Sequence, residues 1–196
     1  AEKLNVLAAQ LAAINKEKSV DSLSPSQQQH SDLLEHYQNG RFSESEKLAR
    51  SISQEFPQHQ FAWKVLGAVL KQTGRIIESL TAMQKSVQLV PQDATAHSNL
   101  GVTLQELGRL DEAEVSCREA IALTPRYTTA HNNLGVTLQQ LARLDEAEVS
   151  YAQAIALKPD FAEAHNNLGN TLQQLGRLDE SEASLRQAIA LKPDFS

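Results

Sequence analysis

Residues 131–161 read HNNLGVTLQQLARLDEAEVSYAQAIALKPDF, and close variants of this phrase return along the chain in steps of 34 residues. Residues 94–127 and 128–161 differ at only 10 of their 34 positions. The same step separates five of the six prolines, Pro57, Pro91, Pro125, Pro159 and Pro193. A fixed period of this length indicates an array built from one repeated structural unit.

The sequence pattern of each unit predicts two helices joined by a turn. In residues 128–161, apolar side chains at helical spacing predict a first helix from Thr129 to Leu141. A turn follows over residues 142–144, and a second helix runs to Leu157, before Pro159 ends it. At the start of four of the five second helices, Asp or Ser precedes Glu by three residues, which predicts capping boxes. The pairs are Ser43/Glu46, Asp111/Glu114, Asp145/Glu148 and Asp179/Glu182.

Glycine recurs at two places in the unit. Four glycines fall inside the predicted first helices, namely Gly67, Gly101, Gly135 and Gly169. Glycine inside a helix costs about 0.5–1 kcal/mol relative to alanine, so we expect the paired helix to approach too closely for a side chain. Gly108 and Gly176 fall at predicted helix ends, where glycine adopts the left-handed conformation at little cost.

Charge and composition exclude several partners. The chain of 196 residues has a formal charge of −6 and no run of basic residues, which argues against nucleic acid as a partner. Its apolar runs are far shorter than the ~20 residues that span a bilayer, so we expect no membrane partner. Cys117 stands alone and can form no internal disulfide, which is consistent with a cytoplasmic protein.

The sequence offers no motif for catalysis or for cofactor binding, so we expect neither an enzyme nor a cofactor. His97, His131 and His165 are 34 residues apart. Equivalent residues of successive helix pairs lie too far apart to share one zinc ion, so we interpret these histidines as packing residues and expect no metal. Cys117 takes the position that Tyr151 and Leu185 occupy in later units, which indicates a small core residue.

The unit resembles the tetratricopeptide repeat. The pattern of that family has a large residue at position 4, Leu-Gly at 7 and 8, small residues at 20 and 27, and Pro at 32. In one unit these positions hold His131, Leu134, Gly135, Ala147, Ala154 and Pro159. The resemblance implies an all-α fold, a right-handed superhelical solenoid of antiparallel helix pairs.

The resemblance also implies the boundaries of the repeats. Four repeats cover residues 60–93, 94–127, 128–161 and 162–196. A degenerate first repeat covers residues 26–59, with Asp32 and Leu33 in place of Leu-Gly. Residues 1–25 precede the array as an expected N-terminal helix and linker.

In this family the first helices line a concave groove that binds proteins. The resemblance therefore implies a protein or peptide partner held by Lys64, Lys71, Asn99, Gln105, Asn132, Asn133, Gln139, Asn166, Asn167, Asn170 and Gln173. Most of these are amides, which both donate and accept hydrogen bonds and so can pair with a peptide main chain of any sequence. Asn99, Asn133 and Asn167 share repeat position 6 and are similar to the ladder with which O-linked N-acetylglucosamine transferases hold extended peptides.

Two other functions stay open. The repeats are similar to the non-catalytic arm of larger glycosyltransferases or sulfotransferases, and the chain begins and ends as a fragment of a longer protein would. Alternatively, the stack is a structural scaffold that assembles with itself through its terminal helices into a homo-oligomer. The apolar residues expected to carry that contact are Leu4, Leu7, Leu11 and Ile14 near one end and Leu185, Ile189 and Leu191 near the other.

Overall fold

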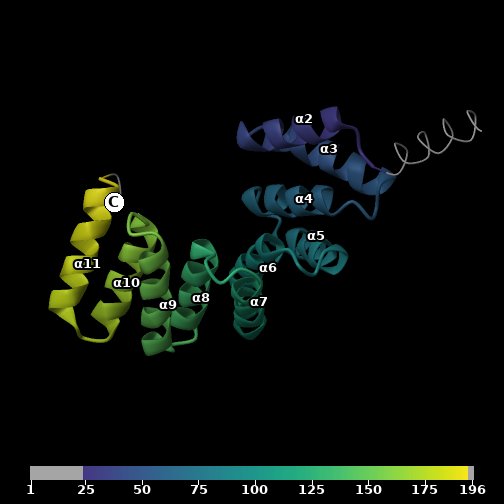
Figure 1. Cartoon of the computed structure of the whole chain (residues 1–196). Coiled ribbons are helices and arrows are strands. Elements are labelled where there is room, and N and C mark those ends of the chain that lie inside the picture. Colours follow the sequence, from purple (N-terminus) through teal and green to yellow (C-terminus); the bar gives the residue numbers. More distant parts are fainter. Residues whose placement is uncertain (1–23, 194–196) are drawn as a thin grey trace, which may run out of the picture. The chain divides into compact units, whose positions relative to one another are not determined.

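The computed structural model of the chain describes residues 24–193. Every regular element in this range is an α-helix (Figure 1), so the predicted all-α fold is confirmed. The helices are α2 (Gln27–Gln38), α3 (Phe42–Glu55), α4 (Gln60–Gln72), α5 (Ile76–Leu89), α6 (Ala94–Glu106), α7 (Leu110–Leu123), α8 (Thr128–Gln140), α9 (Leu144–Leu157), α10 (Ala162–Gln174) and α11 (Leu178–Leu191). The helix expected near the N-terminus, with its apolar stripe, lies outside the described residues.

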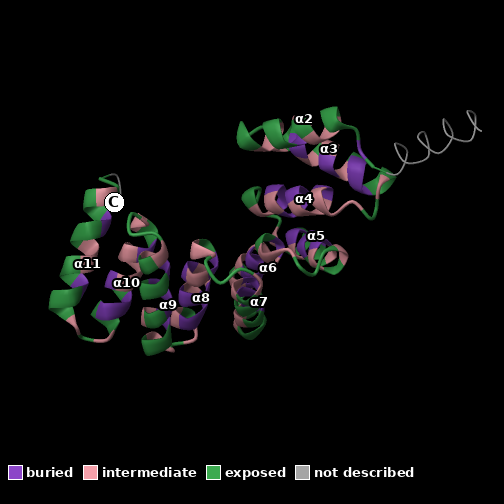
Figure 2. Ribbon diagram, viewed as in Figure 1, coloured by how far each residue is buried: buried purple, intermediate pink, exposed green. Residues whose placement is uncertain are grey.

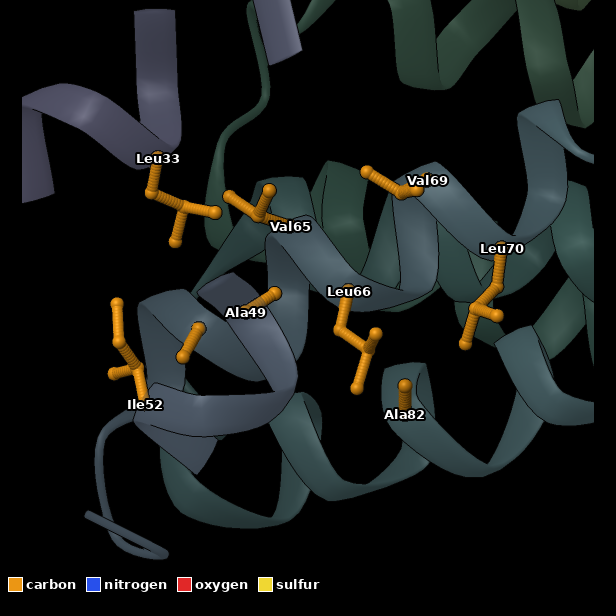
Figure 3. Close-up of a cluster of buried hydrophobic side chains, with 9 residues drawn as sticks. Leu33, Ala49, Ile52, Val65, Leu66, Val69, Leu70 and Ala82 are labelled. Carbon is orange, nitrogen blue, oxygen red and sulfur yellow. The ribbon is translucent and has the colours of Figure 1, made fainter. Parts of the chain in front are cut away.

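The described residues form two compact units, one ending at Leu89 and the other beginning at Val90. In the first unit, buried apolar side chains from α2 to α5 form a single cluster (Figure 3). Leu33 of α2, Ile52 of α3 and Leu70 of α4 are each at most 1 % exposed. Leu33 takes the repeat position at which later units have glycine. At this position α2 therefore contributes a buried side chain to the core, whereas the later first helices have none.

In the second unit, α6 to α11 pack as three successive helix pairs. Each of α6 and α8 contacts the second helix of its own pair and also the first helix of the next pair. Figure 2 shows that these helices carry buried residues along one face and exposed residues along another. The apolar pattern that predicted α8 is buried accordingly, with Ala130, Leu134 and Leu138 each at most 5 % exposed.

The glycines inside the first helices confirm the predicted close approach. A Cβ atom at Gly135 would lie 2.5 Å from Cε1 of Tyr151, and one at Gly101 would lie 2.7 Å from Sγ of Cys117. Gly67 and Gly169 meet Met83 and Leu185 in the same way. Since real Cβ atoms essentially never come within 3.0 Å of such neighbours, the paired helices could not pack as they do around a larger residue.

The predicted capping boxes of the second helices are wrong. The N-caps of α3, α7, α9 and α11 are Arg41, Arg109, Arg143 and Arg177, and none of these side chains caps its helix. The aspartates of the second unit lie inside the first turn, where a negative charge still suits the positive end of the helix dipole. Side-chain caps occur instead at two first helices, where Asp93 accepts main-chain bonds at α6 and Ser26 forms a capping box with Gln29 at α2.

The turn within each helix pair places one residue in the left-handed region. Gly108 and Gly176 have φ angles of 69° and 76°, as their place at the helix ends predicted. Ala142 occupies the same repeat position with a φ of 58°. A residue with a Cβ is strained there by about 1–3 kcal/mol, so this turn is less stable than its neighbours.

Candidate functional site

The amides predicted to bind a partner lie mainly on three helices of the second unit. Asn99 and Gln105 belong to α6, Asn133 and Gln139 to α8, and Asn167 to α10. The remaining predicted residues of this unit are Asn132 on α8 and Asn166, Asn170 and Gln173 on α10. Lys64 and Lys71 lie on α4 of the first unit, so the compact amide surface is formed by α6, α8 and α10.

Two of the ladder asparagines connect successive repeats. Asn133 Nδ2 donates to Ser98 Oγ at 3.0 Å, which links α8 to α6. Asn167 Nδ2 donates to Asn132 Oδ1 at 3.1 Å, which links α10 to α8. Each of these asparagines therefore uses its amino group to hold the stack together, a role that the sequence analysis did not predict.

Asn132 differs from the other predicted residues because it is only 1 % exposed. Its Oδ1 accepts the bond from Asn167, and its Nδ2 donates to Glu163 Oε1 at 3.0 Å. A partner cannot reach a side chain buried to this degree. Asn132 supports the ladder from beneath, and Glu163 is a neighbour that the sequence analysis missed.

The glutamine side chains of the surface also make internal bonds. Gln105 Nε2 donates to the main-chain oxygen of Asn133 at 2.7 Å and to Thr137 Oγ1. Gln139 Oε1 accepts a bond of 3.0 Å from the Tyr151 hydroxyl. These bonds fix the direction in which each amide is turned, so the surface is more ordered than a set of solvated side chains.

The remaining amides keep their hydrogen-bonding groups open. The side chains of Asn99, Asn166, Asn170 and Gln173 make no hydrogen bond to any described residue. Asn170 and Gln173 are exposed, whereas Asn99 and Asn166 are half-buried. These four side chains offer both donors and acceptors to a ligand without first breaking an internal bond.

The three equivalent histidines fix the loops between repeats. The Nε2 atoms of His97, His131 and His165 lie 2.9–3.0 Å from the main-chain oxygens of Pro91, Pro125 and Pro159. A carbonyl oxygen only accepts, so Nε2 carries the proton and donates. Trp63 Nε1 donates to the oxygen of Pro57 at 3.0 Å from the same repeat position. These ring nitrogens therefore join α4, α6, α8 and α10 each to the proline that precedes it.

A second set of repeated contacts was missed by the sequence analysis because its partners are 29 residues apart. Arg143 donates to Glu114 of the preceding repeat at 2.5 Å and to Glu146 of its own helix at 2.6 Å. Arg177 contacts Glu148 and Glu180 in the same way, and Arg75 contacts Glu46 and Glu78. Leu80 stands where the pattern would place a glutamate for Arg109.

These arginines change the ionisation of their glutamates. Burial by itself would raise the pKa of Glu114, but hydrogen bonds from Arg143 and Arg118 bring it below its ordinary value. The pKa of Glu146 is also lowered, chiefly by the hydrogen bond from Arg143. The ion pairs lie along the second helices, apart from the amides of α6, α8 and α10, so they act on stability and not on the amide surface.

Cys117 is fully buried beside Gly101, as expected for a core residue. Burial raises the pKa of its thiol to about 12. Within residues 24–193, no group of three or more potential metal-binding side chains comes together. None of the helices described here combines the length and the apolar character that spanning a bilayer requires.

The helix pairs and the amide surface that they present are those of a helical-repeat scaffold of the kind that carries protein interactions. Residues 94–127 and 162–195 match the sequence model of the tetratricopeptide repeat, and residues 143–176 match a further TPR repeat model. The chain therefore contains tetratricopeptide repeats. Comparison with curated protein sequences gave no significant match.

Solved structures with similar folds include tetratricopeptide proteins of bacteria. A structure of MamA, residues 41 to the end, from Desulfovibrio magneticus RS-1 has a TM-score of 0.75 at 15 % identity, covering 90 % of this chain and 98 % of its own. Another crystal structure of MamA has a TM-score of 0.71 at 22 % identity, covering 81 % and 93 %. A thermophilic TPR protein from Thermus thermophilus has a TM-score of 0.72 at 26 % identity, covering 86 % and 92 %. Identities this low support the fold and carry no partner over to this chain.

Proposed function

We propose that the chain is a non-enzymatic scaffold that binds an extended peptide segment of a partner protein along α6, α8 and α10. One observation carries this proposal. Three successive first helices of one compact unit present side-chain amides, and those of Asn99, Asn166, Asn170 and Gln173 have no internal partner among the described residues. Such groups can pair with main-chain N–H and C=O groups, which every extended peptide offers at regular intervals.

The chemistry of this surface predicts broad sequence tolerance and weak dependence on salt. The ladder residues are uncharged, and the carboxylate of Glu163 accepts its bond from Asn132, beneath the ladder. Electrostatic attraction therefore contributes little, and screening by salt removes little. A partner that bound through acidic or basic clusters would show the opposite behaviour.

Peptide binding to two matched variants tests the proposal. Replacing Asn99 and Asn170 by Ala removes open amides, and each lost hydrogen bond should weaken binding by about 0.5–1.5 kcal/mol. Replacing Gln153 and Gln187 by Ala removes two exposed amides from the second helices α9 and α11, and should leave binding unchanged. Equal affinities for the two variants, or a steep loss of affinity with salt, would contradict the proposal.

Association of the chain with itself is a second candidate, and Ile189 of α11 is the observation that favours it. Ile121, Ile155 and Ile189 share one repeat position, but the first two are half-buried whereas Ile189 is 54 % exposed. An apolar side chain left uncovered in this way is a potential contact with a second copy. Leu185 is not part of the same exposed surface, because it packs against Gly169. Light scattering on the chain and on Ile189→Lys tests this candidate, which fails if both are monomeric at high concentration.

A further inference from the structure

The three side chains Glu163, Asn132 and Asn167 form a chain of hydrogen bonds with a fixed direction. A carboxylate can only accept, so the group that Asn132 turns to Glu163 Oε1 must be its amino group. The oxygen of Asn132 then faces Asn167, and Asn167 must answer with its own amino group at 3.1 Å. The carboxylate therefore settles which edge Asn167 turns inward, even though amide oxygen and nitrogen look alike in shape.

The other edge of Asn167 is left for a ligand. Its Oδ1 accepts no bond from any described residue, and the side chain is half-buried, so part of it reaches solvent. Gln105 is turned in the same sense, because its amino group donates to the main-chain oxygen of Asn133, which can only accept. Asn167 on α10 and Gln105 on α6, at the two ends of the surface, thus turn their side-chain oxygens towards a ligand.

The hydrogen bond between Asn133 of α8 and Ser98 of α6 does not fix the orientation of its amide in this way. Asn133 donates to the hydroxyl of Ser98, and a hydroxyl both donates and accepts, so this amide can turn either edge outward. Ser98 and Asn132 share one repeat position, as do Thr129 and Glu163. The amide of Asn133 can therefore take either orientation, whereas that of Asn167 is fixed. The difference comes from Asn132 and Glu163, which replace Ser98 and Thr129 of the preceding repeats.

We propose that Glu163 and Asn132 are positioning residues that turn Asn167 Oδ1 outward as an acceptor, in the same sense as Gln105 Oε1, so that the partner must donate hydrogen bonds to these two oxygens. The donors are main-chain N–H groups of an extended segment, which lies with one N–H-bearing edge towards α6 and α10. Basic side chains are the other source of donors, but the regular, uncharged ladder matches a main chain better. This inference rests on the proposed function. It adds that the main-chain N–H groups of the peptide are the groups that bond to the surface.

A first measurement needs no peptide. In nitrogen-15 NMR spectra, the side-chain NH2 of Asn167 should exchange with water more slowly than that of Asn170, because only the former donates inside the fold. Asn132→Ala should abolish the difference, while Asn132→Ser, which keeps an acceptor as at Ser98, should retain part of it. Equal exchange of the two side chains in the native chain would overturn the orientation.

The second measurement uses peptides of twelve residues selected from a random display library on the whole chain, then resynthesised with each main-chain nitrogen methylated in turn. Methylation at the residues that face the ladder should weaken binding about tenfold or more, because an oriented acceptor then loses its donor. Glu163→Gln keeps an acceptor for Asn132 but also permits the reversed network. It should reduce that penalty, whereas Glu119→Gln, which removes one exposed charge from α7, should leave the penalty unchanged.

The possible outcomes separate the two proposals. If no peptide is selected, the proposed function itself fails. If peptides bind but tolerate methylation at every position, the main chain is not the donor and the inference fails alone. Binding that is lost when a Lys or Arg of the peptide is replaced by Ala, with methylation tolerated, would assign the donors to basic side chains and overturn it too. A uniform loss of affinity in Glu163→Gln, with the methylation penalty unchanged, would reduce Glu163 to a structural residue.

Discussion

Gly135 of α8 lies directly against the ring of Tyr151 of α9, so that a Cβ atom at Gly135 would come within 2.5 Å of Tyr151 Cε1. Tyr151 is fully buried and its hydroxyl donates to Gln139, so the ring cannot swing aside freely. The close pairing of α8 and α9 therefore depends on the absence of a side chain at Gly135.

The first prediction concerns that contact. Alanine would gain about 1 kcal/mol of helix propensity over glycine, but overpacking in a closed core costs about 1–3 kcal/mol. We expect Gly135→Ala to lower the free energy of unfolding by up to about 2 kcal/mol, and Gly135→Leu to lower it more. Urea unfolding followed by circular dichroism measures this. Ala152→Leu, on the exposed face of α9, is the control, and an effect no larger than the control's would refute the close-contact argument.

The second prediction concerns the turn at Ala142. Its φ of 58° is strained for alanine, and glycine relieves the strain while losing about 0.4–1 kcal/mol to the entropy of the unfolded chain. We therefore expect Ala142→Gly to raise the free energy of unfolding by about 1 kcal/mol. Ala152→Gly, in the middle of α9, should lower it by a similar amount. A loss of stability in both variants would show that the turn is not strained.

The third prediction concerns acid. Glu114 has a pKa below its ordinary value of 4.5 in the folded chain, so its ionised form stabilises the fold above that pH. This stabilisation is lost as the pH falls through the lowered pKa. We expect Arg143→Met to flatten the fall in stability between neutral pH and pH values below 4.5. Arg126→Met removes an equal charge from an exposed turn residue and should leave the acid slope unchanged. Equal slopes in all three chains would contradict the ion-pair account.

The fourth prediction concerns Cys117. Burial raises the pKa of its thiol to about 12, so the folded chain holds little thiolate at neutral pH and reagents reach the sulfur only when the second unit opens. We expect its labelling by a thiol reagent to be at least about a thousandfold slower in buffer than in urea. Ser51→Cys in a Cys117→Ala background provides an exposed thiol for comparison. Similar rates for the two thiols would show that Cys117 is accessible.

The sequence alone predicted the features that recur in every repeat. The helix pairs, the glycine contacts and the left-handed turn at Gly108 follow from residues that return every 34 positions, because each feature is decided within one unit. The second helices begin one residue before the predicted aspartates, since the arginine that ends each turn takes the N-cap position. The regular return of Arg41, Arg75, Arg109, Arg143 and Arg177 was the available signal for the ion pairs.

The bonds between repeats could not be predicted in the same way. Asn133 bonds to Ser98 and Asn167 to Asn132, each 35 residues away, and nothing in one repeat indicates which amide edge meets the next. Asn132 was predicted to face a ligand because the resemblance to the tetratricopeptide repeat places its repeat position in the groove. Its burial follows from Glu163 and Asn167, which belong to the following repeat and supply the partners that a buried amide requires.

Mapping a bound peptide by NMR is the most direct test of the central claim, that α6, α8 and α10 form the binding surface. A library-selected peptide should shift the side-chain amide signals of Asn99, Asn133 and Asn167 and leave those of Gln153 and Gln187 in place. The main-chain signals of Val115 and Val149, which are 68 % and 69 % exposed on α7 and α9, should also stay unchanged. Shifts concentrated on those second helices, with the asparagine signals unmoved, would contradict the account.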